Sequence, residues 1–426
     1  MKNIKKAVVV GLGYVGLPTM VAIARSRVCE VVGYDLDKKK IKDIKNRIDF
    51  LNDKDISLYL RDNSLLVSSN KDIMEACDVF IICVPTPVSN DHQPDYSLVE
   101  SAVLSVCPYL RKGAHVVLES TVNPGTCEER LVPIIEKNTR YKVGRDINVA
   151  HCPERINPGD KRFNVYNINR NIGSINKKSN EIIADFYRAF ITGAKINEVS
   201  NLKIAEATKI VENTFRDINI AYVNELAMSF DKMGIDIKET LEAASNKPFS
   251  FLPHWPGCEI NDHCIAVDPY YLIERAALSG FDHKFLKIAR EINNGMPLYT
   301  VNKLVEEMKK QKMSLAKTSV LLLGLTYKAN IADTRESPSM VMWDIMKDMG
   351  MNCKVYDPFV KGDYSNLADA VNGNKAIILG VGHQEFLNGL NLILKKSKVK
   401  IIIDGKNCLD KEKIKKMGII YRGIGR

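Results

Sequence analysis

The sequence of 426 residues has no apolar run approaching the roughly 20 residues that a membrane-spanning helix needs. Its basic amino terminus resembles the start of a secretory signal, but the apolar run that comes next, Ala7 to Val10, is short and leads into glycines. The ten cysteines include no CxxC pair, which in a long chain with a large core is typical of free thiols in a reducing compartment. We therefore expect a cytoplasmic protein without a membrane segment.

The sequence also lacks arginine-rich helices, interleaved basic and aromatic runs, low-complexity segments and short-period repeats. Its 61 Lys and Arg outnumber 51 Asp and Glu, giving a formal net charge of +10, but the lysines are scattered. This pattern argues against nucleic-acid binding and favours a cationic surface that attracts small anionic ligands such as nucleotides. The 45% hydrophobic content excludes a disordered chain, and the length predicts two or three domains.

Strand and helix patterns alternate in two parts of the sequence, separated by a long helical part. Such alternation predicts parallel sheets with helices on both faces. From Asn201 to Lys247 the pattern is helical, with no Gly or Pro before Gly234, and helical spacing resumes at 285–308. We therefore predict an α/β fold with two Rossmann-like, doubly wound parallel-sheet domains joined by a central helical segment, with boundaries at 1–200, 201–312 and 313–426. The predicted strands are 7–10, 31–35, 79–84, 115–118, 319–325, 353–357, 375–381 and 399–404.

The first strand pattern is followed by GLGYVG, which fits the GxGxxG pattern of a dinucleotide-binding turn. The three glycines permit the tight turn, the approach of the backbone to a pyrophosphate, and close packing of helix on strand. Asp35, at the end of the second strand, can accept the ribose hydroxyls and favours NAD over NADP, although lysines follow at 38–40. The alternative, a glycine turn without a cofactor, leaves the accompanying strand, helix and acidic residue unexplained. The predicted cofactor contacts in the turn are Gly11, Gly13, Tyr14, Val15 and Gly16.

A second concentration of reactive side chains lies in HWPGCEINDHCIAVDPYYL, residues 254–272. Imidazole and thiolate are ordinary zinc ligands, so a metal site is one interpretation. The spacing from His254 to Cys264 matches no common zinc pattern, and we predict no metal. A buried cysteine without a function is a further alternative.

The segment HCIAVDPYYL resembles the nucleophile motif of the UDP-glucose/GDP-mannose dehydrogenase family, with Cys264 in the place of the nucleophile. Six other segments resemble that family's motifs in the family's order, so the resemblance covers nearly the whole chain. It implies an NAD-dependent nucleotide-sugar dehydrogenase that forms a homodimer through its central helices. The six segments are GLGYVGLP at 11–18, VPTP at 84–87, ESTVNPGT at 119–126, CPERINPGD at 152–160, KIVENTFRDINIAYVNELA at 209–227 and GLTYKANIADTRESPS at 324–339.

The resemblance implies oxidation of a primary alcohol to a carboxylate by loss of two hydrides, each taken by an NAD. The Cys264 thiolate would capture the intermediate aldehyde as a thiohemiacetal and release the acid through a thioester. Lys209 and Asn213 lie four apart in a helical pattern and hence on one face. By resemblance, Lys209 stabilises the developing oxyanion and activates Cys264, while Asn213 donates a hydrogen bond. Without the motif, a solvated lysine beside a core amide would be the simpler interpretation.

Further roles are implied by the same resemblance. Asp268 is expected to act as general base or to organise a water that Thr121 also holds, and Glu154 is expected as a catalytic residue near the sugar and the reacting water. Thr86 and Thr121 are expected to line the nicotinamide side of the cofactor site, and Arg335 to reach the cofactor edge. Lys328 is expected to pair with the substrate diphosphate, and Lys406 to contact substrate from a neighbouring part of the assembly. The full set expected at the UDP-sugar is Glu154, Arg155, Lys209, Asn213, Arg216, Asn219, Lys328 and Lys406.

The helix sequence at 209–227 resembles the branch of the family that oxidises UDP-N-acetylmannosamine or UDP-N-acetylglucosamine at carbon 6, for surface polysaccharide or glycan precursors. Arg216 and Asn219 in this helix would reach the acetamido group or the sugar hydroxyls. The alternatives are UDP-glucose or GDP-mannose as substrate, and a catalytically silent homologue that binds nucleotide sugars. The silent homologue is motivated by a departure from the family pattern PGPGxGGHC, but the catalytic residues are all present and we expect a working enzyme. The residues that stand where glycines are usual are Glu259, Asn261 and Asp262.

Overall fold

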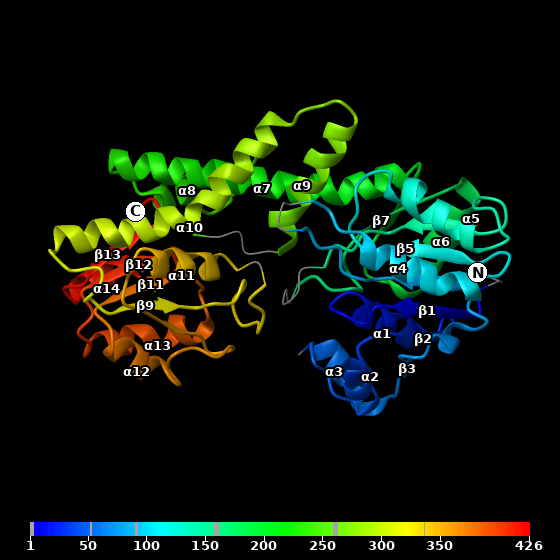
Figure 1. The fold of residues 1–426 in the computed structure, drawn as a ribbon, viewed down its shortest axis with the longest axis horizontal. Helices are drawn as coiled ribbons and strands as arrows, with labels where there is room; N and C mark the ends of the chain where they lie inside the picture. The colour runs from blue at the N-terminus through cyan, green and yellow to red at the C-terminus, as the bar shows by residue number, and fades with distance from the viewer. Residues whose placement is uncertain (1–3, 52, 90–92, 157–161, 259–262, 336) are drawn as a thin grey trace. The chain divides into compact units, whose positions relative to one another are not determined.

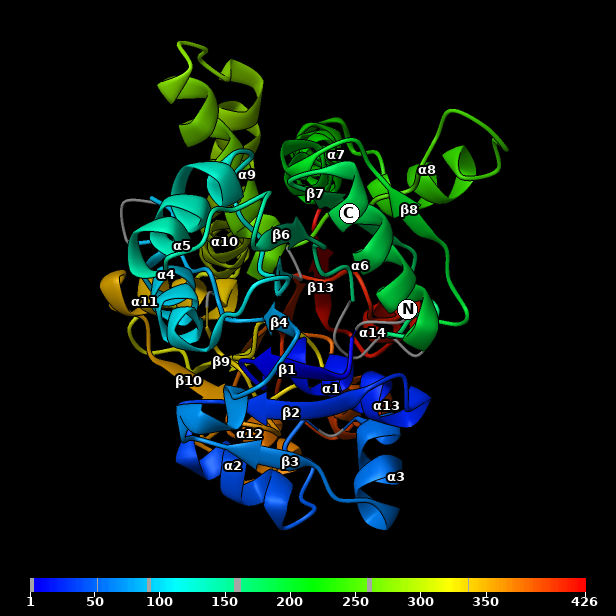
Figure 2. The same ribbon diagram turned by 90° about the vertical axis from the view of Figure 1, so that its right-hand side faces the viewer.

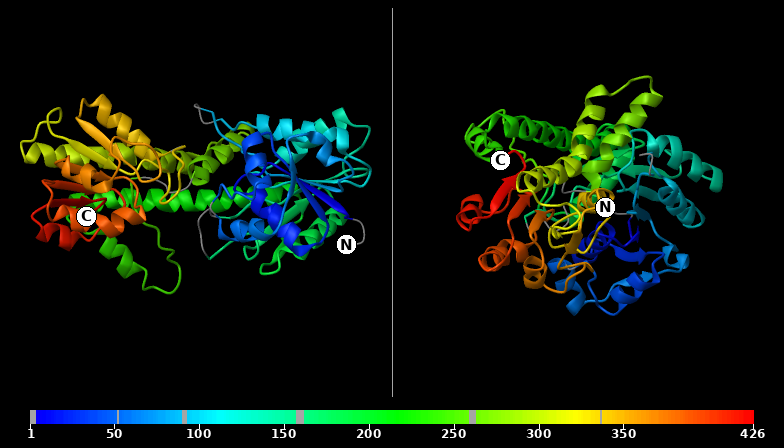
Figure 3. Two further views of the ribbon diagram at one scale, coloured as in Figure 1. Left: turned by 90° about the horizontal axis from the view of Figure 1, so that it is seen from below. Right: turned by 60° about the vertical axis from the view of Figure 1, so that its left-hand side comes forward.

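The computed structural model of the protein describes residues 4–51, 53–89, 93–156, 162–258, 263–335 and 337–426 (Figure 1). The chain forms two compact units: an N-terminal unit, Met1–Glu212 with Tyr270–Phe281, and a C-terminal unit, Asn213–Pro269 with Asp282–Arg426. The division falls within two helices, α7 (Leu202–Met233) and α9 (His263–Leu278). The helix α7 has 32 residues and is unbroken (Figure 3). None of the described helices is long and apolar enough to span a membrane.

The N-terminal unit alternates strands and helices in the order that the sequence predicts. Its strands are β1 (Lys6–Val10), β2 (Glu30–Tyr34), β3 (Leu66–Ser68), β4 (Val79–Ile82), β5 (His115–Leu118), β6 (Asn148–His151), β7 (Arg170–Ser174) and β8 (Ile196–Glu198). Its α-helices are α1 (Gly16–Ser26), α2 (Lys38–Lys45), α3 (Lys54–Asp62), α4 (Ser97–Val106), α5 (Val132–Asn138) and α6 (Lys177–Phe190). Short 3₁₀ turns occur at Lys71–Met74 and Cys107–Tyr109, and a π-helical turn at Cys127–Leu131.

These strands form one sheet in the order β3-β2-β1-β4-β5-β6-β7-β8. The strands β1, β4 and β5 are buried almost throughout, as expected of a parallel sheet covered on both faces. The helices α1 and α6 pack together, and α4 packs with α5 on the other side of the sheet (Figure 2). The other pairs of this sheet are parallel, whereas β6 and β7 run antiparallel.

The C-terminal unit holds the second sheet and most of the long helices. Its strands, β9 (Val320–Leu323), β10 (Cys353–Tyr356), β11 (Ala376–Leu379), β12 (Ile401–Asp404) and β13 (Ile420–Gly423), pair in parallel in the order β10-β9-β11-β12-β13. Its further helices are α8 (Ile237–Ala244), α10 (Lys284–Lys310), α11 (Pro338–Asp348), α12 (Leu367–Asn372), α13 (Gln384–Leu394) and α14 (Lys411–Lys416).

Alternate residues of these strands build two cores, one on each face of the sheet. Leu321 and Leu323 of β9 join a cluster with α12 and α13, whereas Val320 and Leu322 join a cluster with α10 and α11. Side chains of a strand alternate between faces, so a continuous apolar run such as VLLL is what a sheet covered on both sides requires. The two predicted sheets joined by a long helical segment are therefore confirmed.

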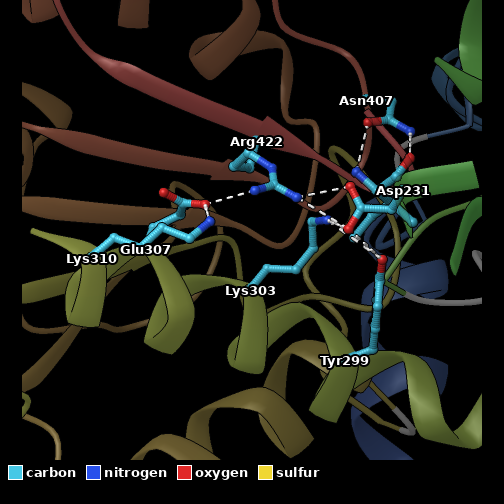
Figure 4. Close-up of polar contacts among 8 residues, drawn as sticks. Asp231, Tyr299, Lys303, Glu307, Lys310, Asn407 and Arg422 are labelled. Atoms are coloured by element: carbon cyan, nitrogen blue, oxygen red, sulfur yellow. Dashed lines mark hydrogen bonds and ion pairs between the residues drawn. The ribbon is translucent and has the colours of Figure 1, made fainter. Parts of the chain in front are cut away.

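A buried network of charges fastens α7 and α10 to β13 (Figure 4). Arg422 donates to Asp231 at 2.8 Å and to Glu307 at 2.6 Å. Lys303, with only 2% of its side chain exposed, donates to Asp231 at 2.7 Å. Removing Asp231 would leave the buried ammonium of Lys303 without its carboxylate, at a cost of about 3–5 kcal/mol. The network therefore holds the last strand and both long helices in a fixed relation within the C-terminal unit.

Candidate functional site

The turn after β1 has the geometry of a phosphate-binding loop. Gly11 has φ +92°, and a Cβ on it would lie 2.8 Å from the carbonyl oxygen of Cys83. A Cβ on Gly16 would lie 1.8 Å from the carbonyl oxygen of Gly11, so the helix can approach the strand only without a side chain there. A Cβ on Gly13 would meet no atom within 4 Å. The turn is thus closed on its helix side and open at Gly13, next to the amino terminus of α1, where backbone amides favour an anion.

Asp35 follows β2 and is tied to this turn. Its Oδ2 accepts a hydrogen bond from the backbone N–H of Leu12 at 2.7 Å, and its Oδ1 accepts one from Asp37 at 2.8 Å. The Lys40 Nζ lies 3.7 Å from Oδ2. The structure therefore brings the glycine turn and the predicted ribose-binding carboxylate together.

Three predicted residues lie beyond the carboxyl ends of β4, β5 and β6, which are neighbours in the sheet. Thr86 follows β4, and its carbonyl oxygen accepts a hydrogen bond from the Tyr271 hydroxyl at 2.7 Å. Thr121 follows β5 and is half-buried. Glu154 follows β6, and its backbone N–H donates to the carbonyl oxygen of Glu119 at 3.2 Å. Ligands of open parallel sheets bind at this edge, so these residues share the edge with the glycine turn.

A buried ionic cluster behind Glu154 was missed by the sequence reasoning. Arg170 of β7 has 1% of its side chain exposed and lies 3.8 Å from carboxylate oxygens of both Glu119 and Glu154. The Tyr187 hydroxyl donates to Glu119 at 2.5 Å. Burial is the largest influence on Glu119 and raises its pKa, against the opposing charge of Arg170. Burial disfavours the charge of Arg170, but the two carboxylates outweigh burial and raise the pKa of the guanidinium. Arg170 is therefore a permanent cation beside Glu154.

The motifs at 119–126 and 152–156 are both anchored to α7. The Glu206 carboxylate accepts backbone N–H bonds from Gly125 at 2.5 Å and from Cys127 at 2.8 Å. Arg155 donates to both oxygens of Glu212, at 3.0 and 2.6 Å. Lys209 lies between these two glutamates in the helix and is half-buried. Arg155, expected at the substrate, thus holds its own loop against the helix that carries Lys209.

In the C-terminal unit the structure joins two of the predicted catalytic side chains. The Asn213 amide donates to Asp268 Oδ2 at 2.5 Å, and Asp268 is 2% exposed. Cys264 lies in α9, four residues before Asp268, but its side chain is outside the described structure. Residues Glu259, Asn261 and Asp262 of the altered loop also lie outside the described residues.

The neighbouring parts of this unit are described. Arg216 is exposed on α7, and the Asn219 amide donates to the carbonyl oxygen of Phe215 at 2.7 Å. His254 begins the segment that was considered as a possible metal site. Its Nδ1 lies 2.9 Å from the carbonyl oxygen of Leu252. Among the described residues, no group of three or more His, Cys, Asp or Glu is arranged to hold a metal ion.

The residues predicted at the substrate and at the cofactor edge in the last domain follow β9 and β12. Lys328 lies in the loop after β9 and is half-buried. Arg335, in the same loop, makes a bidentate ion pair with Asp333, with its closest contact at 2.6 Å. Lys406 follows β12 and borders a cavity of about 130 Å³. The cavity is lined by Lys238, Glu242, Trp255, Pro256, Lys406 and Asn407.

Comparison with known proteins agrees with the motifs along the whole chain. The description "UDP-glucose/GDP-mannose dehydrogenase family" covers the NAD binding domain at residues 5–191, the central domain at 203–295 and the UDP binding domain at 321–411. The chain belongs to this family. It is 36% identical over 423 residues to the UDP-N-acetyl-D-mannosamine dehydrogenase of Pyrococcus horikoshii, covering 98% of each chain. It is 37% identical over 423 residues to the UDP-N-acetyl-D-glucosamine 6-dehydrogenase of Pseudomonas aeruginosa, covering 97% of this chain and 99% of that one.

Solved structures extend this similarity to the fold. The P. horikoshii UDP-N-acetylmannosamine dehydrogenase matches with a TM-score of 0.92 at 35% identity, covering 99% of each chain. A Staphylococcus aureus UDP-N-acetyl-mannosamine dehydrogenase matches with a TM-score of 0.84 at 34% identity, covering 99% of each chain.

The predictions of the family, the fold class, the NAD cofactor and the enzyme class are confirmed. The chain is an NAD-dependent nucleotide-sugar dehydrogenase. The glycine turn fits this cofactor, because the open position at Gly13 is the one that a pyrophosphate approaches. The roles of the individual site residues and the domain boundaries stay predictions.

Proposed function

We propose that the protein oxidises a UDP-N-acetylhexosamine at carbon 6 to the corresponding uronate without releasing the intermediate aldehyde. The observation that carries the proposal is the hydrogen bond between Asn213 and the buried Asp268, one helical turn after Cys264. A general base held by an amide beside a thiol suits a reaction that ends in thioester hydrolysis. Whole-length similarity to dehydrogenases named for UDP-N-acetylmannosamine and UDP-N-acetylglucosamine supports the substrate class.

Each residue of the proposed site has its own part in the reaction. The Cys264 thiolate forms a bond to the aldehyde carbon produced by the first oxidation, and Lys209 stabilises the oxygen that becomes negative. The carbon of this thiohemiacetal then loses its remaining hydride and becomes a thioester. Asp268 takes a proton from water as the water oxygen forms a bond to the thioester carbon. The C–S bond then breaks, its electron pair returns to the Cys264 thiolate, and the acid leaves. NAD, when bound, accepts the hydrides.

The overall balance fixes the stoichiometry. One primary alcohol, two NAD⁺ and one water give one carboxylate, two NADH and three protons. The thiolate is regenerated and no aldehyde needs to leave the pocket. Two NADH per sugar is therefore the signature of the proposed route.

The decisive experiment supplies NAD with UDP-N-acetylmannosamine, UDP-N-acetylglucosamine, UDP-glucose or GDP-mannose and counts NADH against sugar consumed. We expect two NADH per acetamido sugar and at least about tenfold lower kcat/KM for UDP-glucose. Cys264→Ser should abolish uronate formation, whereas Cys353→Ser, a matched change of a half-buried thiol in β10, should leave it intact. UDP-glucose oxidation as efficient as that of both acetamido sugars would refute the substrate assignment. Binding of NAD and UDP without turnover of any sugar would favour the silent homologue.

Exposed apolar side chains on the long helices support a homodimer. Phe215 and Tyr222 of α7 are 49% and 55% exposed, and Ile288 of α10 is 53% exposed. Large exposed apolar side chains on central helices are typical of surfaces that pair across a two-fold axis. Analytical ultracentrifugation should give twice the mass of the chain, and a monomer at micromolar concentration would contradict this part of the proposal.

A further inference from the structure

The loop that carries Lys328 does not run directly from its strand into a helix. In the N-terminal unit the turn after β1 runs into α1 at Gly16. In the C-terminal unit the chain leaves β9 at Leu323 and reaches the next helix, α11, only at Pro338. The family description assigns UDP binding to the domain at 321–411, so this loop must keep its shape by other contacts.

His383 supplies three of those contacts from the amino terminus of α13. Its side chain is fully buried. Its Nδ1 accepts a hydrogen bond from the backbone N–H of Asn330 at 3.0 Å. Its Nε2 lies 3.2 Å from the Thr326 hydroxyl and 3.1 Å from Asp357 Oδ2. The Asn330 side chain returns the contact, because its Oδ1 accepts the backbone N–H of Gln384 at 3.1 Å.

The partners determine which ring nitrogen carries the proton. Nδ1 accepts a backbone N–H and therefore has no hydrogen of its own. The Thr326 hydroxyl donates to the carbonyl oxygen of Lys328 at 2.9 Å, so it can only accept from the ring. Asp357 is a carboxylate and also accepts. The ring is therefore neutral with its hydrogen on Nε2, and every polar atom of the ring has a partner.

The strand pairing shows that His383 occupies the position in the second sheet that Thr86 occupies in the first. The register pairs Val10 with Ile82 in the first sheet and Leu323 with Leu379 in the second. Thr86 and His383 are each four residues beyond the strand end. The predicted nicotinamide-side residue of one unit thus corresponds to the loop-holding residue of the other.

We propose that His383 is a positioning residue for UDP, acting through the loop 324–330 that it ties to Asp357 and to α13. The inference rests on the proposed function in taking a UDP-sugar as substrate, and on the sequence prediction that Lys328 pairs with its diphosphate. Loss of the ring leaves the Asn330 N–H without its acceptor and removes one of the hydrogen bonds that Asp357 Oδ2 accepts, so the loop loses its fixed conformation before UDP binds.

The experiment measures UDP and NAD binding to the full-length protein by calorimetry, without turnover. His383→Leu removes all three ring contacts, His383→Gln keeps a donor toward Asp357, and His383→Asn keeps an acceptor toward Asn330. We expect the UDP dissociation constant to rise about tenfold or more in H383L and least in H383N, with NAD binding unchanged. KM for the UDP-sugar should also rise most in H383L and least in H383N, while KM for NAD stays constant.

Asn374→Ala is the matched control. Asn374 is 1% exposed and donates to the Tyr364 hydroxyl and the Ala370 carbonyl, before β11 rather than after it. It should lower the melting temperature without weakening UDP binding. If H383L and H383N are folded and bind UDP within twofold of wild type, the inference is wrong and the proposed function is untouched. If N374A weakens UDP as much as the His383 variants do, the effect is general destabilisation and the inference is also wrong. A wild-type protein that fails to bind UDP overturns both.

Discussion

The turns after the first strands of the two sheets share a backbone plan. Gly11 and Gly324 come directly after β1 and β9, with φ values of +92° and +91°. A Cβ on Gly11 would lie 2.8 Å from the carbonyl oxygen of Cys83, and one on Gly324 would lie 2.5 Å from the Cβ of Val381. Each turn therefore closes against a residue just beyond the neighbouring strand.

The acidic residue after the second strand repeats in the same way. Asp35 Oδ2 accepts the backbone N–H of Leu12 at 2.7 Å, and Asp357 Oδ2 accepts that of Leu325 at 2.7 Å. Both aspartates follow a tyrosine that ends the strand. The sequence signal for this repeat is the pair VVGYD and CKVYD.

The two turns differ in the element that each one leads into. The N-terminal turn begins α1, so backbone amides are available to phosphates, and Asp35 stays at the edge of the site. The C-terminal turn continues as a loop, Asp357 is covered by His383, and Lys328 stands at the position of Val15. In our proposal one unit binds a pyrophosphate through backbone and the other through a side chain. A lysine-based site needs a braced loop because the charge must be held in place.

The largest expected effect comes from adding a methyl group to the shared glycine. Gly11→Ala and Gly324→Ala should each destabilise their own unit by about 3 kcal/mol, because the left-handed backbone and the tight contact both oppose a Cβ. Gly11→Ala should lose NAD binding and keep UDP binding, and Gly324→Ala should do the reverse. Calorimetric titration of both ligands, with thermal unfolding, measures both effects.

Gly13→Ala is the control for this pair. Its Cβ would meet nothing within 4 Å, so the melting temperature should be unchanged while NAD binding weakens. If Gly11→Ala and Gly324→Ala affect the same ligand, the two turns do not serve separate ligands and the comparison fails.

Asp357 should make the stability of the C-terminal unit depend on pH. Burial would raise its pKa, but hydrogen bonds from His383 and from the N–H groups of Leu325 and Phe359 outweigh burial and lower it. A carboxyl whose pKa is lower in the folded than in the unfolded state stabilises the fold above its unfolded pKa of about 3.9 and loses this as pH falls. Asp357→Asn should therefore cost about 2 kcal/mol at pH 7, with the difference shrinking below about pH 4.

Denaturant unfolding of wild type and D357N across pH 3–8 measures this difference. Asp35→Asn is the counterpart, and it should weaken NAD binding while leaving UDP binding unchanged. A D357N penalty that stays constant down to pH 3 would show that the side-chain shape, rather than its charge, holds the turn.

Much of the fold could be predicted because apolar runs and glycine turns are local signals. Every strand that the sequence predicts is present. These strands are β1, β2, β4, β5, β9, β10, β11 and β12. The strands β3 and β8 are three residues long and too short for a periodicity to be visible. Strand β7 begins with Arg170, whose burial depends on carboxylates far away in the sequence. No pattern within RNIGS indicates that an arginine will lie in the core.

The candidate site likewise contains residues that a local sequence signal identifies and residues that only a distant partner defines. The motif residues of the cofactor turn could be named because each glycine answers a local steric demand. Glu206, Glu212 and His383 hold the segments near 125, 155 and 330 in place, and they were missed because a supporting residue is defined only by its distant partner. Asp357 could have been found, since its YD dipeptide after an apolar strand repeats the signal of Asp35.

The smallest effect is expected at Lys40, which forms an ion pair with Asp35. The corresponding aspartate of the second sheet, Asp357, contacts His383. The Lys40 Nζ lies 3.7 Å from Asp35 and the lysine side chain is 36% exposed, so the ion pair should contribute at most about 0.5 kcal/mol to stability. Lys40→Ala should change the dissociation constant of NAD by less than about twofold. It should weaken NADP further, because a 2′-phosphate beside Asp35 depends on a nearby cation. Titrations at low and high salt should give a difference that disappears as ionic strength rises. A tenfold loss of NAD affinity would instead show that Lys40 holds Asp35 in its binding position.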